Sequence, residues 1–195
     1  GFEHDLIQAF SQSQNWTLSW QEEDSPQALF NLVETHQLNM AAAALPRAVV
    51  KDRHLIAGPV LFETPVHIVY RRGDKRPRNM ADLEGRKLAL IVGSGHTPIL
   101  MRKHPGLDWT TLEDVWPEEL LAQLQAGHYD AVVINGMNFD PMRSHYPDLA
   151  VAFNIGDMQQ IVWAFPIRSS RVLRNSLARF VEQARKDGTR KRIYE

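Results

Sequence analysis

The residues with the clearest chemical potential form a short glycine-containing loop, Gly93-Ser94-Gly95-His96-Thr97. The loop follows an apolar run of strand type and precedes a helical pattern, so its backbone N–H groups are expected at a helix start, where anions bind. Ser94, His96 and Thr97 add side-chain donors beside these N–H groups. The same pattern also fits an ordinary strand-to-helix turn with Ser or Thr as the N-cap. The local sequence leaves both interpretations open.

A dinucleotide site is a further interpretation of this loop. The GxG at 93–95 follows a predicted strand, and Glu113 stands about twenty residues further on, as in a Rossmann fingerprint. The third glycine of that fingerprint is missing, and Pro98 lies in the first turn of the helix. A nucleotide-cofactor enzyme of doubly wound type is therefore kept as an alternative, while the main prediction is a chain with no cofactor.

The other reactive residues form no recognisable catalytic or metal-binding set. The sequence has no cysteine, which excludes disulfides, thiolate ligands and a cysteine nucleophile. Its 8 histidines form no HExxH motif and no i, i+4 pair, and no serine lies in a GxSxG motif. We therefore expect no metal site and no catalytic residues, and the chain is predicted not to be an enzyme.

Charge and hydropathy exclude several partners. The formal net charge of −1 gives no global attraction to nucleic acid or to an anionic membrane. The basic stretch 168–192 is predicted to be a solvated helix face, because its Phe180 belongs to the apolar stripe of that helix. No apolar run is long enough to span a membrane. The start at Gly1 lacks the features of a signal peptide. We expect the chain to be a piece cut from a longer protein.

Helical and strand patterns alternate along most of the chain, which favours parallel βαβ units. Strand patterns are predicted at 16–20, 65–70, 87–92, 107–112, 130–134, 149–153 and 160–166. Helical patterns are predicted near 6–10, 26–33, 80–84 and 117–126, after the loop at 93–97, and from Ser170 onward. The polar segment 71–78, which contains Gly and Pro, is predicted to be a linker before a second unit. Four tryptophans in strand-like contexts, at positions 16, 20, 109 and 163, are predicted to pack in the core.

Several segments, in the right order and over most of the chain, resemble the periplasmic solute-binding proteins of family 3. Within that fold the sequence is most similar to the N-terminal solute-binding domain of membrane-bound lytic transglycosylase F. The segments that carry the resemblance are Asp82-Leu83-Glu84-Gly85-Arg86-Lys87-Leu88-Ala89, the run 124–133, Tyr70-Arg71-Arg72-Gly73, Arg76-Pro77-Arg78, the loop at 93–96, the run 146–153, Trp163-Ala164-Phe165-Pro166 and Asp187-Gly188-Thr189.

This resemblance implies a bilobed α/β fold of the type II periplasmic-binding-protein class, with two βαβ lobes and a two-crossing hinge. Lobe one is expected at 1–71 plus 159–195 and lobe two at 72–158, with the first strand of lobe one apparently missing before Gly1. It also implies a periplasmic location, outer-membrane-associated in the parent protein, with a C-terminal catalytic domain after Glu195. The chain itself is then a sensor or regulatory domain that binds a small polar ligand.

The resemblance also assigns ligand residues. They are predicted to be Lys51, Thr64, Ser94, Gly95, His96, Thr97 and Asn135, with Lys51, or alternatively Arg47, opposite the other six. The family commonly has an aspartate where Asn135 stands, to pair with an α-ammonium group, and an arginine where Lys51 stands; lysine lacks the bidentate fork of arginine. Two expected tyrosines are Val60 and Leu61. These departures favour a peptide or muropeptide over a free amino acid, and an empty, degenerate pocket is a further alternative. A solute-binding protein of an ABC-type transporter, for an amino acid or another small metabolite, is the alternative.

Overall fold

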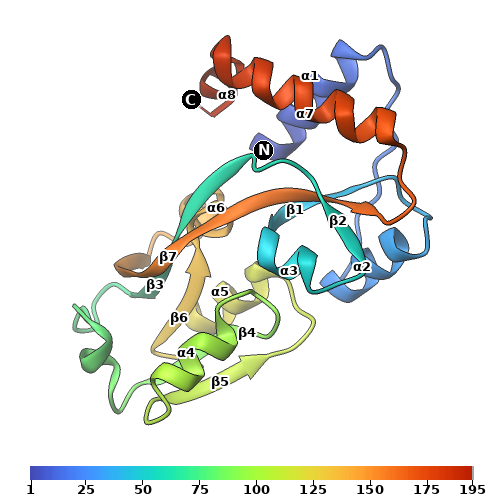
Figure 1. Ribbon diagram of the computed structural model, residues 1–195. Coiled ribbons are helices and arrows are strands. Elements are labelled where there is room, and N and C mark those ends of the chain that lie inside the picture. The colour runs from blue at the N-terminus through green and yellow to red at the C-terminus, as the bar shows by residue number, and fades with distance from the viewer. Residues whose placement is uncertain (195) are drawn as a thin grey trace. The chain divides into compact units, whose positions relative to one another are not determined.

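The computed structural model describes residues 1–194, which form two compact units. Unit 1 contains residues 1–62 and the chain from Ile161 onward, and unit 2 contains residues 63–160. The chain passes between the units twice, once within strand β3 (Phe62–Arg71) and once within strand β7 (Leu149–Pro166) (Figure 1). Both passages therefore lie inside strands. The basic segment 71–78, predicted to be the linker, follows β3 and belongs to unit 2.

Unit 1 combines three short helices of the N-terminal part with two C-terminal helices and a small antiparallel sheet. Strands β1 and β2 both pair with the second half of β7, for example Ala41 with Ala164 and Ile56 with Phe165. Its other elements are α1 (Phe2–Ser13), α2 (Pro26–Glu34), β1 (Ala41–Pro46), α3 (Arg47–Lys51), β2 (Leu55–Ala57), α7 (Arg171–Lys186) and α8 (Thr189–Tyr194).

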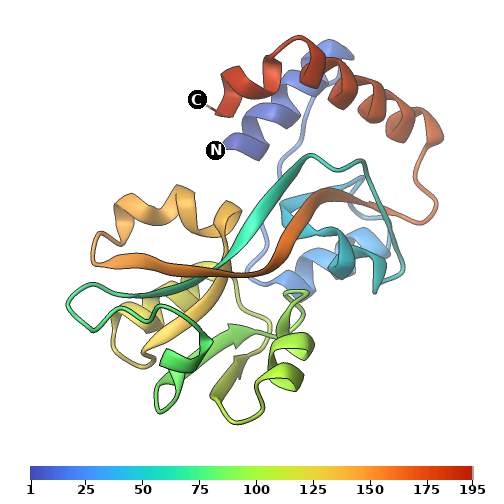
Figure 2. The same cartoon turned by 60° about the vertical axis from the view of Figure 1, so that its left-hand side comes forward.

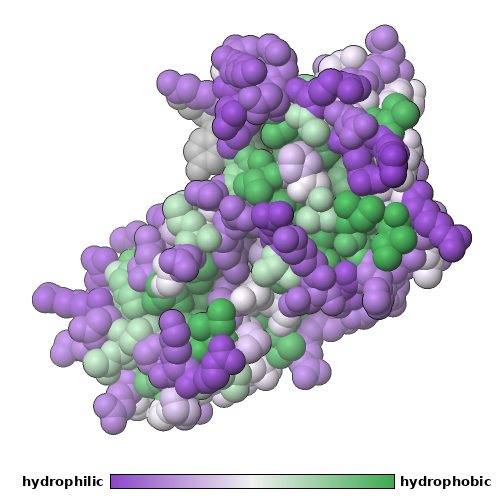
Figure 3. Space-filling view, viewed as in Figure 1, coloured by the Kyte–Doolittle hydropathy of each residue, from purple (hydrophilic) through white to green (hydrophobic). Residues whose placement is uncertain are grey.

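Helix α7 packs on α1 and turns a hydrophilic surface outward. The Phe10 and Phe180 rings lie 5.4 Å apart between centroids, and Leu177 and Val181 are buried on the same stripe. Ser170 caps the helix, since its side chain accepts from the Leu173 N–H. Figure 3 shows the outer surface over α7 as largely hydrophilic. The basic C-terminal stretch is thus the solvated helix face that its sequence pattern predicts; Glu195, predicted to lie at an exposed end, is outside the described residues.

Unit 2 is a mixed sheet with helices on both faces. Strand β4 pairs in parallel with β5 and with β6, and β6 pairs antiparallel with β3. The order of neighbouring strands is β7-β3-β6-β4-β5. Its other elements are the 3₁₀ helix η1 (Met80–Leu83), β4 (Lys87–Ile91), α4 (Thr97–Lys103), β5 (Asp108–Leu112), α5 (Pro117–Gln125), β6 (Ala131–Asn135), α6 (Gly136–Phe139) and the 3₁₀ helix η2 (Asp140–His145).

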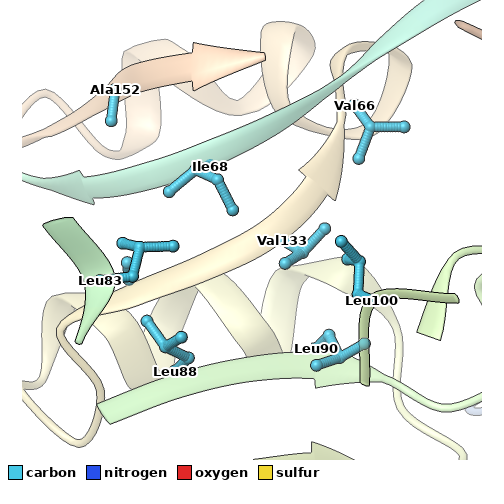
Figure 4. Packing of buried hydrophobic residues seen from close by; sticks show 9 residues of the cluster. Val66, Ile68, Leu83, Leu88, Leu90, Leu100, Val133 and Ala152 are labelled. Atoms are coloured by element: carbon cyan, nitrogen blue, oxygen red, sulfur yellow. The ribbon is translucent and has the colours of Figure 1, made fainter. Parts of the chain in front are cut away.

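Side-chain alternation along the strands of unit 2 builds two apolar layers. Leu88 and Leu90 of β4 meet Leu100 of α4 on one face (Figure 4). Ala89 of the same strand meets the buried leucines of α5 on the other face, among them Leu120. This double burial explains why β4 and β6 read as continuous apolar runs and not as alternating ones. The parallel pairing of β4 with β6 brings the carboxyl ends of both strands to one edge of the sheet.

Two sequence predictions about strands are wrong. Residues 16–20 form no strand, and two predicted core tryptophans are exposed: Trp16 to 41% and Trp20 to 50%. Each packs against one aromatic ring instead, Trp16 edge-on to Phe10 and Trp20 stacked on His4. The predicted strands 149–153 and 160–166 are one strand, β7, because the polar residues between them stay extended. Trp163, by contrast, is fully buried as predicted.

Candidate functional site

The glycine-containing loop connects β4 to α4 at the carboxyl edge of the unit 2 sheet. Gly93 and Gly95 have φ angles of +79° and +92°, a region where residues with a Cβ are strained. The two glycines therefore allow the chain to reverse tightly and bring Ser94 and His96 to the same side. The Ser94 N–H donates back to the Ile91 carbonyl at 3.3 Å, which closes the turn.

The hydroxyl groups of the loop hold it together and do not cap the helix. The Thr97 hydroxyl, which is buried, donates to the Ile91 carbonyl at 2.7 Å. The Ser94 hydroxyl lies 3.1 Å from Thr97 Oγ1 and 3.0 Å from His96 Nε2. The N-cap residue of α4 is His96, which makes no side-chain cap bond. The prediction that a Ser or Thr side chain caps this helix is therefore wrong.

Asn135 ends β6 beside this loop and has two functions in the structure. Its Oδ1 accepts from the Asn138 N–H at 2.9 Å, which makes it the N-cap of α6. Its Nδ2 donates to Gln159 Oε1 at 3.0 Å. The side chain is buried. Asn135 is thus both a helix cap and a member of the polar cluster at the sheet edge.

Gln159 of β7, which is not among the residues predicted from the sequence, joins the loop to Asn135. Its Nε2 donates to the Ser94 carbonyl at 2.9 Å and lies 3.0 Å from His96 Nδ1. Residues from three separate segments thus form one hydrogen-bonded cluster, Ser94–His96–Thr97, Asn135 and Gln159, which we call the loop network. No spacing or motif distinguishes Gln159 from the polar residues around it, so only the path of β7 reveals its partners.

Burial keeps His96 neutral. Removal of the imidazole from water disfavours its charged form and lowers the pKa of His96 from 6.5 to about 4. At neutral pH the loop network therefore contains no formally charged side chain. A pocket with a volume of about 680 Å³ borders Gly95, His96 and Gln159 from the side of α4. This volume lies in the range of small-molecule sites.

Thr64 lies in unit 2 and contacts the residues that follow Asn135. Its Oγ1 accepts from the Met137 N–H at 2.9 Å. The backbone at Gly136 passes so close that an added Cβ would lie 2.9 Å from Thr64 Oγ1 and 3.1 Å from His67 Nε2. Thr64 thus positions the start of α6, and Gly136 is the residue that allows this approach.

Lys51 and Arg47 lie in unit 1, at the two ends of α3, and both are exposed. Their flanking neighbour Arg53 is engaged elsewhere: it pairs with Glu34 at 3.3 Å and lies over the Phe30 ring at 4.1 Å. Lys51 and Arg47 thus belong to unit 1, and the remaining predicted ligand residues belong to unit 2. The contact of Lys51 with a ligand stays a prediction.

Residues 1–194 contain no cluster of histidine, cysteine, aspartate and glutamate side chains that is suited to a metal ion. In the same part of the chain, no helix has the length and apolar character needed to cross a membrane.

Comparison with known proteins identifies the chain's relatives. It is 66% identical over 198 residues to a membrane-bound lytic murein transglycosylase F of Thiobacillus denitrificans, and 32% identical to the Pasteurella multocida protein of that name. These matches cover 100% of this chain but only 42% and 40% of the two relatives. The chain therefore spans about two fifths of the length of these curated relatives.

Solved structures show the same fold at low sequence identity. An ancestral arginine-binding protein bound to arginine superposes with a TM-score of 0.84 at 18% identity, over 100% of this chain and 86% of that one. The GluR0 ligand-binding core from Nostoc punctiforme, in complex with L-glutamate, gives 0.80 at 19%, over 100% and 89%. Residues 1–195 match the family of bacterial extracellular solute-binding proteins, family 3. The chain belongs to this family and is a solute-binding domain with a periplasmic-binding-protein-like α/β fold.

Proposed function

We propose that this chain is the ligand-sensing part of a longer periplasmic protein of the lytic transglycosylase F type. Its ligand is a small polar molecule, a peptide or muropeptide, that contacts Ser94, Gly95, His96, Thr97 and Asn135. Lys51 and Thr64 stay predicted ligand residues. The murein-cleaving activity named for the relatives belongs, in this proposal, to the part of the longer protein outside the matched region, and the location at the outer membrane belongs to the parent.

The observation that carries the proposal is the convergence of the loop network. Side chains from the β4–α4 loop, the end of β6 and β7 meet at the carboxyl edge of the sheet. In open α/β sheets, ligands bind at this edge. The backbone N–H groups of Gly95 and His96 donate to no acceptor within residues 1–194, so the loop retains donors for a ligand oxygen.

The uncharged character of the loop network favours a peptide or muropeptide over a free amino acid. The cluster has no carboxylate at Asn135 to pair with an α-ammonium group, and His96 is neutral at pH 7. The relatives with high coverage of this chain are named as murein enzymes, and fragments of murein are rich in amide and hydroxyl groups. These two points agree on the chemical class of the ligand.

Ligand-induced thermal stabilisation tests the proposal. A ligand at about 100 times its Kd adds about 2.7 kcal/mol to the free energy of unfolding, which raises the Tm of a chain of this size by about 5 to 10 °C. We expect such a shift with a muropeptide or peptide in a panel that also contains free amino acids. Ser94→Trp is expected to abolish the shift, because the new side chain fills the loop surface, and Ser94→Ala to reduce it.

Ser144→Trp is the matched control, because Ser144 is exposed in η2 and takes no part in the loop network. If Ser144→Trp and Ser94→Trp retain the same ligand-induced shift, or if no muropeptide or peptide stabilises the wild type, the proposed function is wrong. Comparison of the unliganded Tm values separates a folding defect of Ser94→Trp from a loss of binding, and Ser94→Ala gives a second measurement where the larger residue disturbs the fold.

A further inference from the structure

Gln159 determines the polarity of the whole loop network. We infer that it is a specificity residue, and that it makes the site selective for ligands with uncharged amide or hydroxyl groups over ligands with an α-ammonium group. This inference rests on the proposed function, since it concerns the ligand of the same site. It adds Gln159, a residue that the family resemblance does not assign, to the selectivity that the departure at Asn135 indicates.

The first step is that the Asn135 cap fixes the Gln159 amide. The Asn138 N–H is a donor, so the Asn135 atom that accepts from it must be the oxygen, and the amide nitrogen must face Gln159. Gln159 therefore turns its oxygen to Asn135 and its nitrogen to the loop. The Ser94 carbonyl, which only accepts, lies 2.9 Å from that nitrogen and fixes the same orientation from the other side.

The second step is that Gln159 fixes the tautomer of His96. The Gln159 nitrogen lies 3.0 Å from His96 Nδ1, so Nδ1 must carry the lone pair, and the single ring proton of the neutral imidazole must lie on Nε2. His96 Nε2 then donates to Ser94 Oγ, Ser94 donates to Thr97 Oγ1, and Thr97 donates to the Ile91 carbonyl. Every hydrogen in this series of hydrogen bonds thus has an acceptor. In an imidazolium, the N–H at Nδ1 would face the N–H of Gln159, so two donors would oppose each other.

The third step is the set of groups left for a ligand. The ordered hydrogen bonds leave a lone pair on Ser94 Oγ, which is partly exposed, whereas Asn135 and Thr97 are buried. The backbone N–H groups of Gly95 and His96 donate to no acceptor within residues 1–194, and both residues border the adjoining pocket. A carbonyl or hydroxyl oxygen accepts from these N–H groups, and a hydroxyl or amide hydrogen donates to the serine oxygen. The site is thus complementary to uncharged polar groups.

An ammonium group finds no charge partner in this arrangement. It would face the N–H groups of the loop, and a buried charge without a partner is costly. The acidic side chain in the wall of the adjoining pocket is Asp157, which is exposed. Its charge is screened by water, so it compensates little for desolvation in the loop network. Discrimination against the ammonium form is the expected result.

Two pairs of probes that differ only in N-acetylation test the inference on the full chain. The pairs are N-acetyl-L-alanine amide against L-alanine amide, and N-acetylglucosamine against glucosamine. Isothermal titration at pH 6 keeps His96 neutral, because its pKa is about 4, and keeps the amino groups of the two non-acetylated probes charged. The acetylated member of each pair is expected to bind at least about tenfold more tightly, since an unpaired charged group costs more than about 1.4 kcal/mol.

Two variants separate the specificity residue from a structural residue. Gln159→Met retains the side-chain volume but removes the amide, so it is expected to reduce the preference for the acetylated probes. It is also expected to let His96 populate both tautomers, which the ¹⁵N chemical shifts of the imidazole ring report. Asn135→Asp retains the cap but supplies a carboxylate, and is expected to reverse the preference toward the ammonium probes. Gln125→Met on the exposed end of α5 and Asn31→Asp on the exposed face of α2 are the matched controls.

The outcomes distinguish this inference from the proposed function. Equal binding of both members of each pair overturns the inference, as does an unchanged tautomer and probe preference in Gln159→Met. If the wild type binds none of the four probes, Asn135→Asp decides: newly acquired binding of L-alanine amide supports the inference, and no acquired binding overturns it. The proposed function is judged separately, by the muropeptide and peptide panel and the Ser94→Trp variant.

Discussion

Burial of a neutral His96 makes the stability of the fold depend on pH in a defined window. The pKa of His96 is about 4 in the folded protein, against 6.5 for an unperturbed histidine. Above pH 6.5 the imidazole is neutral in both the folded and the unfolded chain. As the pH falls from 6.5 to 4, only the unfolded chain takes up the proton, so the free energy of unfolding decreases. Below pH 4 both forms are protonated and the loss is complete.

The magnitude follows from the difference between the two pKa values. At about 1.4 kcal/mol per pH unit, the interval between 6.5 and about 4 corresponds to a loss of about 3 kcal/mol. His96→Asn is the reference variant, because asparagine places an acceptor near the position of Nδ1 but does not titrate. Urea denaturation of both proteins between pH 7.5 and pH 4 gives the two stability curves. The difference between the curves isolates His96, since all other titrating groups are shared.

The wild type is expected to lose about 3 kcal/mol more than His96→Asn over this window. The charged side chains that line the adjoining pocket, Arg78, Lys103 and Asp157, together with His104, are present in both proteins. Their effects on the pH dependence therefore cancel to first order. Parallel stability curves for the two proteins would show that His96 titrates normally in the folded state, and the assignment of a neutral, buried imidazole would be refuted.

Two further predictions concern the scaffold of the site. Gly136→Ala puts a methyl group 2.9 Å from a buried threonine oxygen, so it is expected to lower the free energy of unfolding, measured by urea denaturation, by about 1 to 3 kcal/mol. Gly106→Ala, with open space around it, should change this free energy by less than about 1 kcal/mol. Equal effects of the two substitutions would refute the close approach at Gly136. Leu90→Ala in the fully buried core should cost about 2 to 5 kcal/mol, and Ile99→Ala, 45% exposed, distinctly less.

The parts of the fold that were predictable from the sequence are those whose residues are buried on both faces of a sheet or along one helix stripe. Continuous apolar runs predicted β4 and β6 to within a residue or two. The helix that Pro117 opens was also predicted closely. In each case the local pattern of apolar residues is enough to predict the element, because only one secondary structure buries all of those side chains together.

The errors arose where a distant partner decides the outcome. Trp16 and Trp20 have the local pattern of a strand, but no neighbouring strand pairs with them. Gln159 is a polar residue among others until β7 carries it to Ser94 and Asn135. The loop at 93–97 was found because glycines and hydroxyl residues mark a turn within one short segment. The residue that orders its hydrogens is 65 positions from Ser94 in the sequence.

The two passages between the units lie inside strands, which limits how the protein can be divided. A protease needs a segment that can leave its hydrogen-bonded neighbours and enter an active site in extended form. The passages at Phe62–Glu63 and Gln160–Ile161 lie within β3 and β7, which are neighbours in one sheet. Limited proteolysis is thus poorly suited to releasing the units. A recombinant fragment cut at these points would begin and end within strands, with unpaired backbone groups prone to aggregation.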